Sequence, residues 1–187
     1  FESKSNIWDD TVTSSAGAVD ATRESNLKCD LSEGVTVEFW LQTGSIASAI
    51  TERQVIFDLW NGVTDTTSGE YGRITIELKD TGSPFLVTVL SGTTGYTRQS
   101  IGSGLDQNTL SDWGHYAFSF ATGSSLISTK FYKDGTLNDT LNTGANIGEI
   151  RNPLEARLGA LIHRPAVSAA PAGSGKLSGS IDDFRFW

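Results

Sequence analysis

Apolar and polar side chains alternate with a period of two along much of the chain, which is the pattern of a β-strand with one buried face. Short runs of Gly, Ser, Thr, Asn and Asp separate these stretches, and no convincing helical stripe interrupts them. The sequence therefore predicts an all-β chain of half-buried antiparallel strands. The alternation is clearest over residues 35–42, 55–60, 73–78, 85–90 and 115–120.

One turn can be assigned from its residues. Asp134 and Gly135 lie between two strand-like stretches, 126–132 and 136–141. Asp-Gly supplies the positive φ angles that a tight hairpin needs, so we predict that these two stretches pair through a short turn.

The chain has 187 residues, of which 37% are apolar and 19% charged. This size and composition suit one β domain with a single core, and we expect residues 1–187 to form it. Many short strands separated by turns favour a sandwich of two packed sheets. Residues 163–176 are mostly small or polar and rich in Pro and Gly, so we expect a long mobile loop before the last strand.

The charge balance excludes some partners. A formal net charge of -8 disfavours binding to nucleic acid, because phosphate contacts require clustered Lys and Arg that this chain lacks. No apolar run approaches the ~20 residues that span a bilayer, so we expect no membrane insertion. Cys29 is the single cysteine, which excludes an intrachain disulfide, and we expect it to be a packing residue.

Five phrases follow one another in an order that one known architecture uses. The early phrase is VTVEFWL at 35–41, and the later ones are SDWGHYAFSF at 111–120, KFYKDG at 130–135, ARLGA at 156–160 and LSGSIDDFRFW at 177–187. The series resembles laminin-G-like domains of the concanavalin A-type jelly roll.

The resemblance implies an all-β, two-sheet antiparallel β-sandwich (concanavalin A-like jelly roll) of about 11 to 14 strands. Residues 1–25 would add an N-terminal edge or closing segment. Trp40 and Trp113 occupy positions that pack structurally in the family, so we expect both in the core. We expect Phe118, Phe120 and Ile181 to be buried with them.

Catalytic residues are not found. Glucanases with this fold place carboxylates in an E-x-D-x-x-E pattern on one strand, where a separation of ~5–5.5 Å serves a retaining glycosidase. Glu33 has no carboxylate at 35 or 37, and Glu77 is flanked by Thr75 and Lys79. We therefore assign no catalytic residue and expect the chain not to be an enzyme.

Glycan sites combine aromatic rings with a few polar donors and acceptors. Residues of that chemistry cluster in the middle of the chain, and His163 and Arg164 could contact a ligand from the loop. Our candidate ligand-binding residues are Trp60, Asn61, Tyr71, Tyr96, Arg98, His163 and Arg164.

The resemblance also implies a structural Ca²⁺ held by the closing strand, since relatives often bind one through its aspartate. In this chain Asp182 is the matching residue. Calcium takes six to eight hard oxygens, so Asp182 would need partners such as Asp9, Asp10 or Asp20. The alternative is that Asp182 accepts backbone N–H groups or pairs with Arg185 or Arg157. We expect no other cofactor.

Three classes of function stay open. The first is a non-catalytic recognition module that binds a surface glycan or another extracellular polymer. The second is a structural or interaction domain of a larger assembly, such as a phage virion decoration or tail protein or a bacterial adhesin, and the least favoured is a glycan-active enzyme. The chain starts at Phe1 and contains no Met, which suits part of an extracellular, cell-surface or virion protein. Its expected partner is a glycan or a protein surface.

Overall fold

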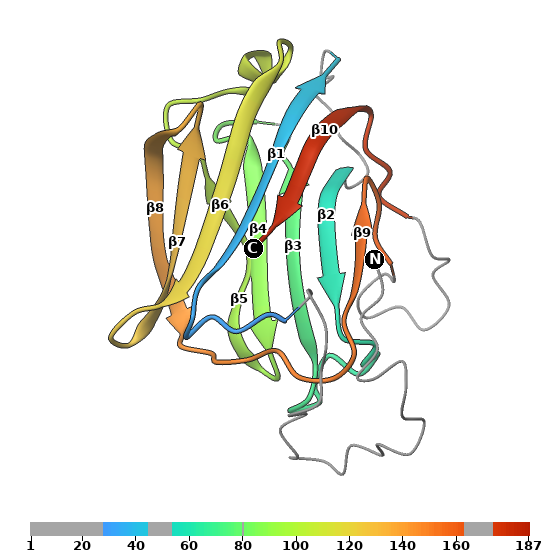
Figure 1. Cartoon of the computed structure of the whole chain (residues 1–187), viewed down its shortest axis with the longest axis vertical. Helices are drawn as coiled ribbons and strands as arrows, with labels where there is room; N and C mark the ends of the chain where they lie inside the picture. The colour runs from blue at the N-terminus through green and yellow to red at the C-terminus, as the bar shows by residue number, and fades with distance from the viewer. Residues whose placement is uncertain (1–27, 45–53, 80, 163–173) are drawn as a thin grey trace.

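The computed structural model describes residues 28–44, 54–79, 81–162 and 174–187, which form two packed antiparallel sheets (Figure 1). The front sheet has the strand order β10-β1-β6-β7-β8, and the rear sheet has the order β5-β4-β3-β2-β9. The strands are β1 Val35–Thr43, β2 Gln54–Trp60, β3 Gly72–Leu78, β4 Phe85–Ser91, β5 Thr94–Ile101, β6 Gly114–Thr122, β7 Leu126–Lys133, β8 Thr136–Ala145, β9 Glu155–Leu158 and β10 Gly179–Phe186.

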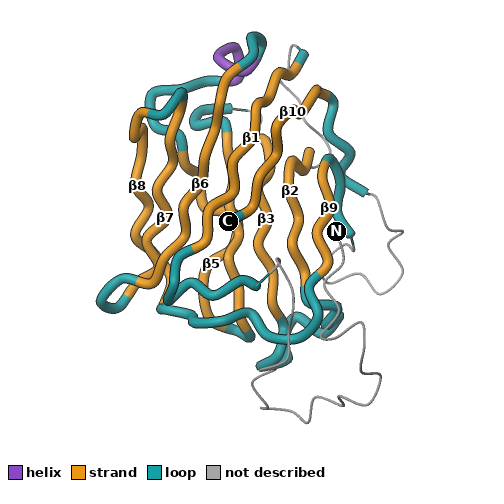
Figure 2. The backbone as a smooth tube through the Cα atoms, viewed as in Figure 1, coloured by secondary structure: helices purple, strands orange, loops and turns teal. Residues whose placement is uncertain are grey.

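Strand dominates the described residues, and the all-β sandwich prediction is confirmed (Figure 2). The one helical element there is the 3₁₀ turn η1, Gln107–Leu110, which Asp106 caps by accepting a hydrogen bond from the backbone N of Thr109. None of the helices in this part of the chain has the length and hydropathy of a membrane span. Ten strands are described, whereas the predicted edge segment 1–25 and most of the predicted loop 163–176 lie outside the described residues.

The predicted hairpin is confirmed. β7 and β8 pair up to Lys133 and Thr136, which leaves Asp134 and Gly135 as a two-residue turn with φ angles of 50° and 76°. The Asp134 carboxylate also accepts a hydrogen bond from the backbone N of His115 at 3.0 Å. The turn is therefore fixed to β6 as well as to its own strands.

Aromatic rings from both sheets fill the centre of the core. Phe118 of β6 lies 6.1 Å from Phe39, 5.3 Å from Phe85 and 4.9 Å from Phe131, measured between ring centroids. Phe118, Phe120 and Cys29 are fully buried, as predicted, while Ile181 is partly buried and packs against the same core. The core is thus built from the inward residues of both sheets.

The prediction that Trp40 and Trp113 are core residues is wrong. Their side chains are 39% and 46% exposed. In β1 the inward positions belong to Val37, Phe39 and Leu41, so the strand's period of two turns Trp40 to the opposite face. The alternation was the better guide here than the family position.

A β-bulge shapes the last strand. Arg185 pairs with Glu38 and Asp182 with Trp40, so three steps along β10 match two along β1. Asp183 absorbs the extra residue with a φ of 46°. Because of this bulge, Ile181 and Phe184 both pack against the core although they are three residues apart.

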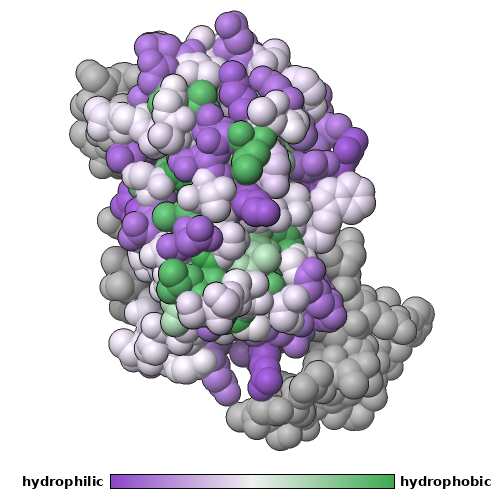
Figure 3. Space-filling view, turned by 90° about the vertical axis from the view of Figure 1, so that its left-hand side faces the viewer, coloured by the Kyte–Doolittle hydropathy of each residue, from purple (hydrophilic) through white to green (hydrophobic). Residues whose placement is uncertain are grey.

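The sheets meet closely along the side where β5 and β8 lie. The Asp139 carboxylate of β8 accepts hydrogen bonds from the backbone N of Gly102 at 3.0 Å and of Ser103 at 2.9 Å. A Cβ atom on Gly144 would lie 2.7 Å from the backbone of Gly95. On this side of the molecule, hydrophilic residues dominate and hydrophobic ones occur in small separate groups (Figure 3).

Candidate functional site

The rear sheet differs from the half-buried strands that the sequence predicts. In β3, Ile74 and Ile76 face the core, so Arg73, Thr75 and Glu77 lie on the outer face of the sheet. All three are nevertheless buried, and so is Asp58 of β2, which lies opposite Thr75. We call this group, together with the neighbouring aromatic rings, the rear-face cluster; its members are Asp58, Trp60, Tyr71, Arg73, Thr75 and Glu77.

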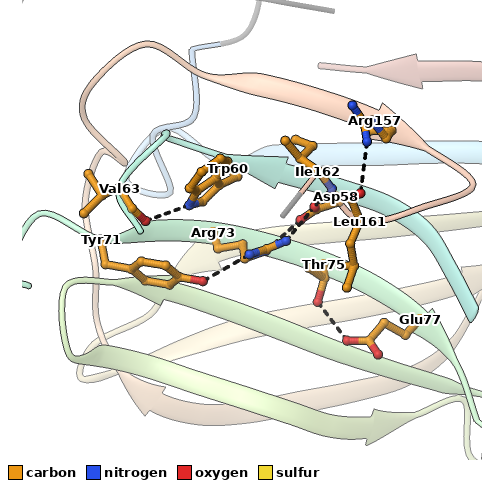
Figure 4. Close-up of polar contacts among 10 residues, drawn as sticks. All are labelled: Asp58, Trp60, Val63, Tyr71, Arg73, Thr75, Glu77, Arg157, Leu161 and Ile162. Carbon is orange, nitrogen blue, oxygen red and sulfur yellow. Dashed lines mark hydrogen bonds and ion pairs between the residues drawn. The ribbon is translucent and has the colours of Figure 1, made fainter. Parts of the chain in front are cut away.

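An ion pair forms the centre of the rear-face cluster (Figure 4). The Arg73 guanidinium donates two hydrogen bonds to Asp58, from Nε to Oδ1 at 2.8 Å and from Nη2 to Oδ2 at 2.7 Å. The backbone N of Ile162 donates a third bond to Oδ2 at 2.7 Å. Since Asp58 and Arg73 are almost completely inaccessible to solvent, this bidentate pair anchors the chain after β9 onto the sheet.

Two opposing effects act on the Arg73 guanidinium. Burial lowers its pKa, whereas the charge and the hydrogen bonds of Asp58 raise it, and the net result is a raised pKa. Arg73 therefore stays protonated. A buried cation of this kind requires its carboxylate partner, because an unpaired charge in the interior is strongly disfavoured.

Trp60 and Tyr71, both predicted ligand residues, come together around Arg73. The Arg73 Cζ lies 5.9 Å from the centroid of the Trp60 ring, and its Nη1 donates to the Tyr71 hydroxyl at 3.4 Å. The Trp60 indole donates to the backbone O of Val63 at 2.9 Å, and both rings pack with Ile162 in a second hydrophobic cluster. Both rings are buried, so they support this face rather than offer open stacking surfaces.

Asn61, another predicted ligand residue, has a structural position. Its Nδ2 donates to the backbone O of Glu70 at 2.6 Å and of Arg151 at 3.1 Å, and its Oδ1 accepts from the backbone N of Gly72 at 2.9 Å. These bonds use its amide to hold the connection between β2 and β3 in place.

Arg98 is the predicted residue that reaches solvent beside the rear-face cluster. Its Nε lies 3.7 Å from Glu77 Oε2, and Thr75 donates a hydrogen bond to the other Glu77 oxygen at 3.2 Å. The Arg98 side chain is 44% exposed, while Glu77 is buried. Arg98 has a φ of 48°, and its backbone N donates to Thr88 Oγ1 at 3.0 Å. Within the described part of the chain, the two Nη groups of Arg98 bond no protein group.

Of the remaining predicted ligand residues, the structure describes Tyr96, which does not join this site. Tyr96 points between the sheets, where its hydroxyl shares a 2.5 Å hydrogen bond with Thr129 and burial raises its pKa. His163 and Arg164 lie outside the described residues.

Asp182 lies on the exposed face of β10. Its Oδ1 accepts a hydrogen bond from the backbone N of Asp183 at 2.8 Å, whereas Arg185 pairs with Asp183 and Glu38. Among the described residues, no three His, Cys, Asp or Glu side chains are grouped to hold a metal. The other ligands proposed for calcium, Asp9, Asp10 and Asp20, lie outside those residues, so the calcium site stays a prediction.

Asp58, Arg73 and Glu77 were not predicted from the sequence as a group. A signal for them exists, because Asp58 is the one charged residue in the otherwise apolar stretch 55–60 and Arg73 alternates with core residues in β3. Opposite charges on two such strands indicate a buried pair if the strands are neighbours. The sequence does not show that β2 and β3 are neighbours, whereas the sheet order does.

Comparison with known proteins identifies the family. The family model described as the concanavalin A-like lectin/glucanases superfamily matches residues 13–187. The chain belongs to this superfamily. The predicted resemblance is thereby confirmed, and the superfamily's name states that it includes lectins and glucanases.

A solved structure shares the fold of this superfamily member. It is a native heptameric SAP-like pentraxin from Limulus polyphemus, with a TM-score of 0.54 and 14% sequence identity. The match covers 86% of this chain and 66% of the pentraxin chain. A comparison with curated proteins found no match. At this identity the pentraxin supports the jelly-roll fold alone.

Proposed function

We propose that this domain is a non-catalytic carbohydrate-recognition module whose ligand binds the outer face of the rear sheet beside Arg98. One observation carries the proposal: the Arg98 guanidinium, whose Nη groups bond none of the described residues, is exposed beside an otherwise buried polar cluster. Glu77 forms an ion pair with Nε at 3.7 Å, and the two Nη groups are the donors that we propose for acceptor oxygens of a glycan.

The scaffold under Arg98 favours recognition. Glu77 is held by Thr75, and the nearby Asp58–Arg73 pair fixes β2 to β3. A donor that is fixed before binding loses less conformational freedom when the ligand arrives. Membership in a superfamily of lectins and glucanases supports a glycan as the ligand.

We propose a binding module and not an enzyme because the sequence lacks the E-x-D-x-x-E carboxylate pattern of the glucanases. β3 carries Arg73, Thr75 and Glu77 on its outer face, so a single carboxylate stands where a glucanase strand presents several. We expect β-glucan, alginate and agarose to stay intact after long incubation with the protein. New reducing ends that disappear in one Asp or Glu variant would contradict this proposal.

Binding can be tested with the variant Arg98→Asn on a glycan array. Asn accepts a left-handed backbone, so the substitution removes the guanidinium without straining β5. The control Lys176→Asn makes the same change in charge at an exposed residue. We expect the wild-type chain and the control to bind the same glycans, and Arg98→Asn to lose at least one of them.

Equal binding of every glycan by Arg98→Asn and the wild type would refute the site. If no glycan binds and the protein instead associates with itself or with a protein surface, the second class of function, a component of a larger assembly, replaces the proposal.

A further inference from the structure

The outer face of the front sheet carries an unusual group of exposed tryptophans. Of the six large hydrophobic side chains that are exposed in the described residues, three are Trp40, Trp113 and Trp187. Trp40 lies in β1, Trp113 directly precedes β6, and Trp187 directly follows β10. These three strands are neighbours in the front sheet.

Register places the tryptophans on one side of the sheet. Trp40 pairs with His115, so its side chain lies on the same side of the sheet as that of His115. Trp113 is two residues before His115, so the alternation of β6 places it on this side too. The Trp187 indole donates to the Glu38 carboxylate at 3.3 Å, which puts it on the outward side of β1. We call Trp40, Trp113 and Trp187, with their neighbours Glu38, His115 and Arg185, the tryptophan face.

Polar contacts hold the side chains between these rings. The Trp40 ring lies 5.5 Å from the His115 ring, whose Nε2 is 3.8 Å from Glu38 Oε2. Arg185 bridges two carboxylates, Glu38 at 3.1 Å and Asp183 at 2.9 Å. The tryptophan face therefore presents partly fixed indoles with hydrogen-bonding groups between them.

The spacing of the rings suits an extended ligand. Trp40 and Trp113 are diagonal cross-strand neighbours, whose Cβ atoms are about 7 Å apart in an antiparallel sheet. The rings of Trp40 and Trp113 are therefore neighbours across β1 and β6. The charged groups of Glu38 and Arg185 lie beside them. A chain molecule can contact both rings in one binding mode.

The chemistry of this face selects the class of ligand. Indoles and charged groups lie beside one another on it, whereas the centre of a protein interface is depleted of charged residues. A pyranose ring matches this arrangement, because it has an apolar C–H face for an indole and hydroxyl groups around its rim for the polar side chains.

The charged side chains of the tryptophan face limit which kind of polysaccharide can bind. The carboxylates of Glu38, Asp182 and Asp183 lie along this face with one guanidinium, that of Arg185. An acidic polysaccharide would meet a net negative surface, which disfavours its binding.

We propose that the tryptophan face is a second carbohydrate-binding surface, separate from the site at Arg98, and that it binds neutral polysaccharide chains through Trp40 and Trp113. The two sites lie on outer faces of different sheets, so each can be removed without the other. Trp187 extends the same surface.

Affinity electrophoresis in gels that contain one polysaccharide each tests this surface. The neutral probes are barley β-glucan, xyloglucan, galactomannan and hydroxyethyl cellulose, and the acidic probes are alginate and heparin. The variants are Trp40→Thr and Trp113→Thr, because Thr suits a strand position. Leu158→Thr removes an equally exposed apolar side chain from β9 of the rear sheet and serves as the control.

We expect at least one neutral probe to retard the wild type and the control equally, and any retardation by alginate or heparin to be the same in the tryptophan variants as in the wild type. Each tryptophan variant should bind that neutral probe about tenfold more weakly, the factor that about 1.4 kcal/mol represents. Unchanged melting temperatures would show that the variants are folded.

Three outcomes would overturn this inference: no retardation of the wild type by any neutral probe, equal binding by both tryptophan variants, or loss of binding in Arg98→Asn alone. The last would leave the proposed function standing and remove only the second surface. A concentration-dependent dimer in sedimentation that Trp40→Thr abolishes would also overturn it, because the face would then be covered by a second copy of the chain.

Discussion

Breaking the buried pair in the rear-face cluster should have a large and strongly non-additive effect on stability. Asp58→Leu removes the acceptor of hydrogen bonds from Arg73 Nε, Arg73 Nη2 and the backbone N of Ile162. It also leaves a guanidinium that is 1% exposed without its carboxylate. Loss of one partner of a buried ion pair typically lowers the free energy of unfolding by about 3–5 kcal/mol.

The double variant Asp58→Leu/Arg73→Met distinguishes a paired charge from two independent residues. Met retains much of the length of the Arg stem, and no uncompensated charge remains between these two positions. Replacement of a whole buried pair by apolar residues is often close to neutral. We therefore expect the double variant to be more stable than either single variant, with a coupling energy of about 2–3 kcal/mol.

Urea denaturation followed by tryptophan fluorescence gives these free energies by linear extrapolation. Glu33→Leu breaks the exposed pair between Glu33 and Lys28, whose charged atoms are 2.9 Å apart, and should leave the free energy of unfolding nearly unchanged. A loss of less than about 1 kcal/mol in Asp58→Leu, or a double variant whose loss is the sum of the two single losses, would refute the buried ion pair as the cause.

Three further outcomes are expected. Phe118→Ala should lower the free energy of unfolding by about 3–5 kcal/mol in urea denaturation, because Phe118 is fully buried among three other aromatic rings. Burial, and then the charge of Asp134, raise the pKa of Tyr116 to about 12. This pKa is above the value of about 10 that a Tyr has in the unfolded chain. The contribution of Tyr116 to the free energy of unfolding is therefore present below pH about 10 and is lost as the pH rises through about 12. Denaturation measured across this pH range would detect the loss. If Asp182 holds a structural Ca²⁺, chelation should lower the melting temperature and Asp182→Ala should remove that sensitivity, since a ligand at a hundredfold excess over its Kd adds about 2.7 kcal/mol; equal melting temperatures in calcium and chelator would contradict this prediction.

The period of two predicted much of the fold because it reports directly on which face of a strand is buried. It assigned Phe118 and Phe120 to the core, and the Asp-Gly turn predicted the β7–β8 hairpin, whose geometry depends on two residues. In the structure the same period turns Trp40 outward, whereas the family argument predicted it in the core. These features depend on residues that are close together in the sequence, so a single sequence is enough to predict them.

The candidate site was harder to predict because it depends on strand pairing and on irregularities. Asp58 and Arg73 meet only because β2 lies beside β3. Tyr96 faces the core and Arg98 reaches solvent because β5 shifts register against β4 after the Tyr96–Val89 pair. Asp183 likewise interrupts the alternation in β10. None of these pairings and register shifts produces a periodic pattern in the sequence, so the sequence alone does not reveal them.

The contact between Gly95 and Gly144 has a consequence for how the domain can be extended or engineered. Where backbone approaches backbone this closely, there is no room for another side chain, and both residues have positive φ angles that favour glycine. A larger residue at Gly144 would act as a wedge that separates the β5 and β8 edges and admits water toward Tyr96 and Thr129, whereas a Cβ atom on Gly95 would collide with the Val89 carbonyl of the neighbouring strand β4. The two sheets are therefore closed on each other along β5 and β8, and variants at Gly144 would measure the resistance of the sandwich to being opened there.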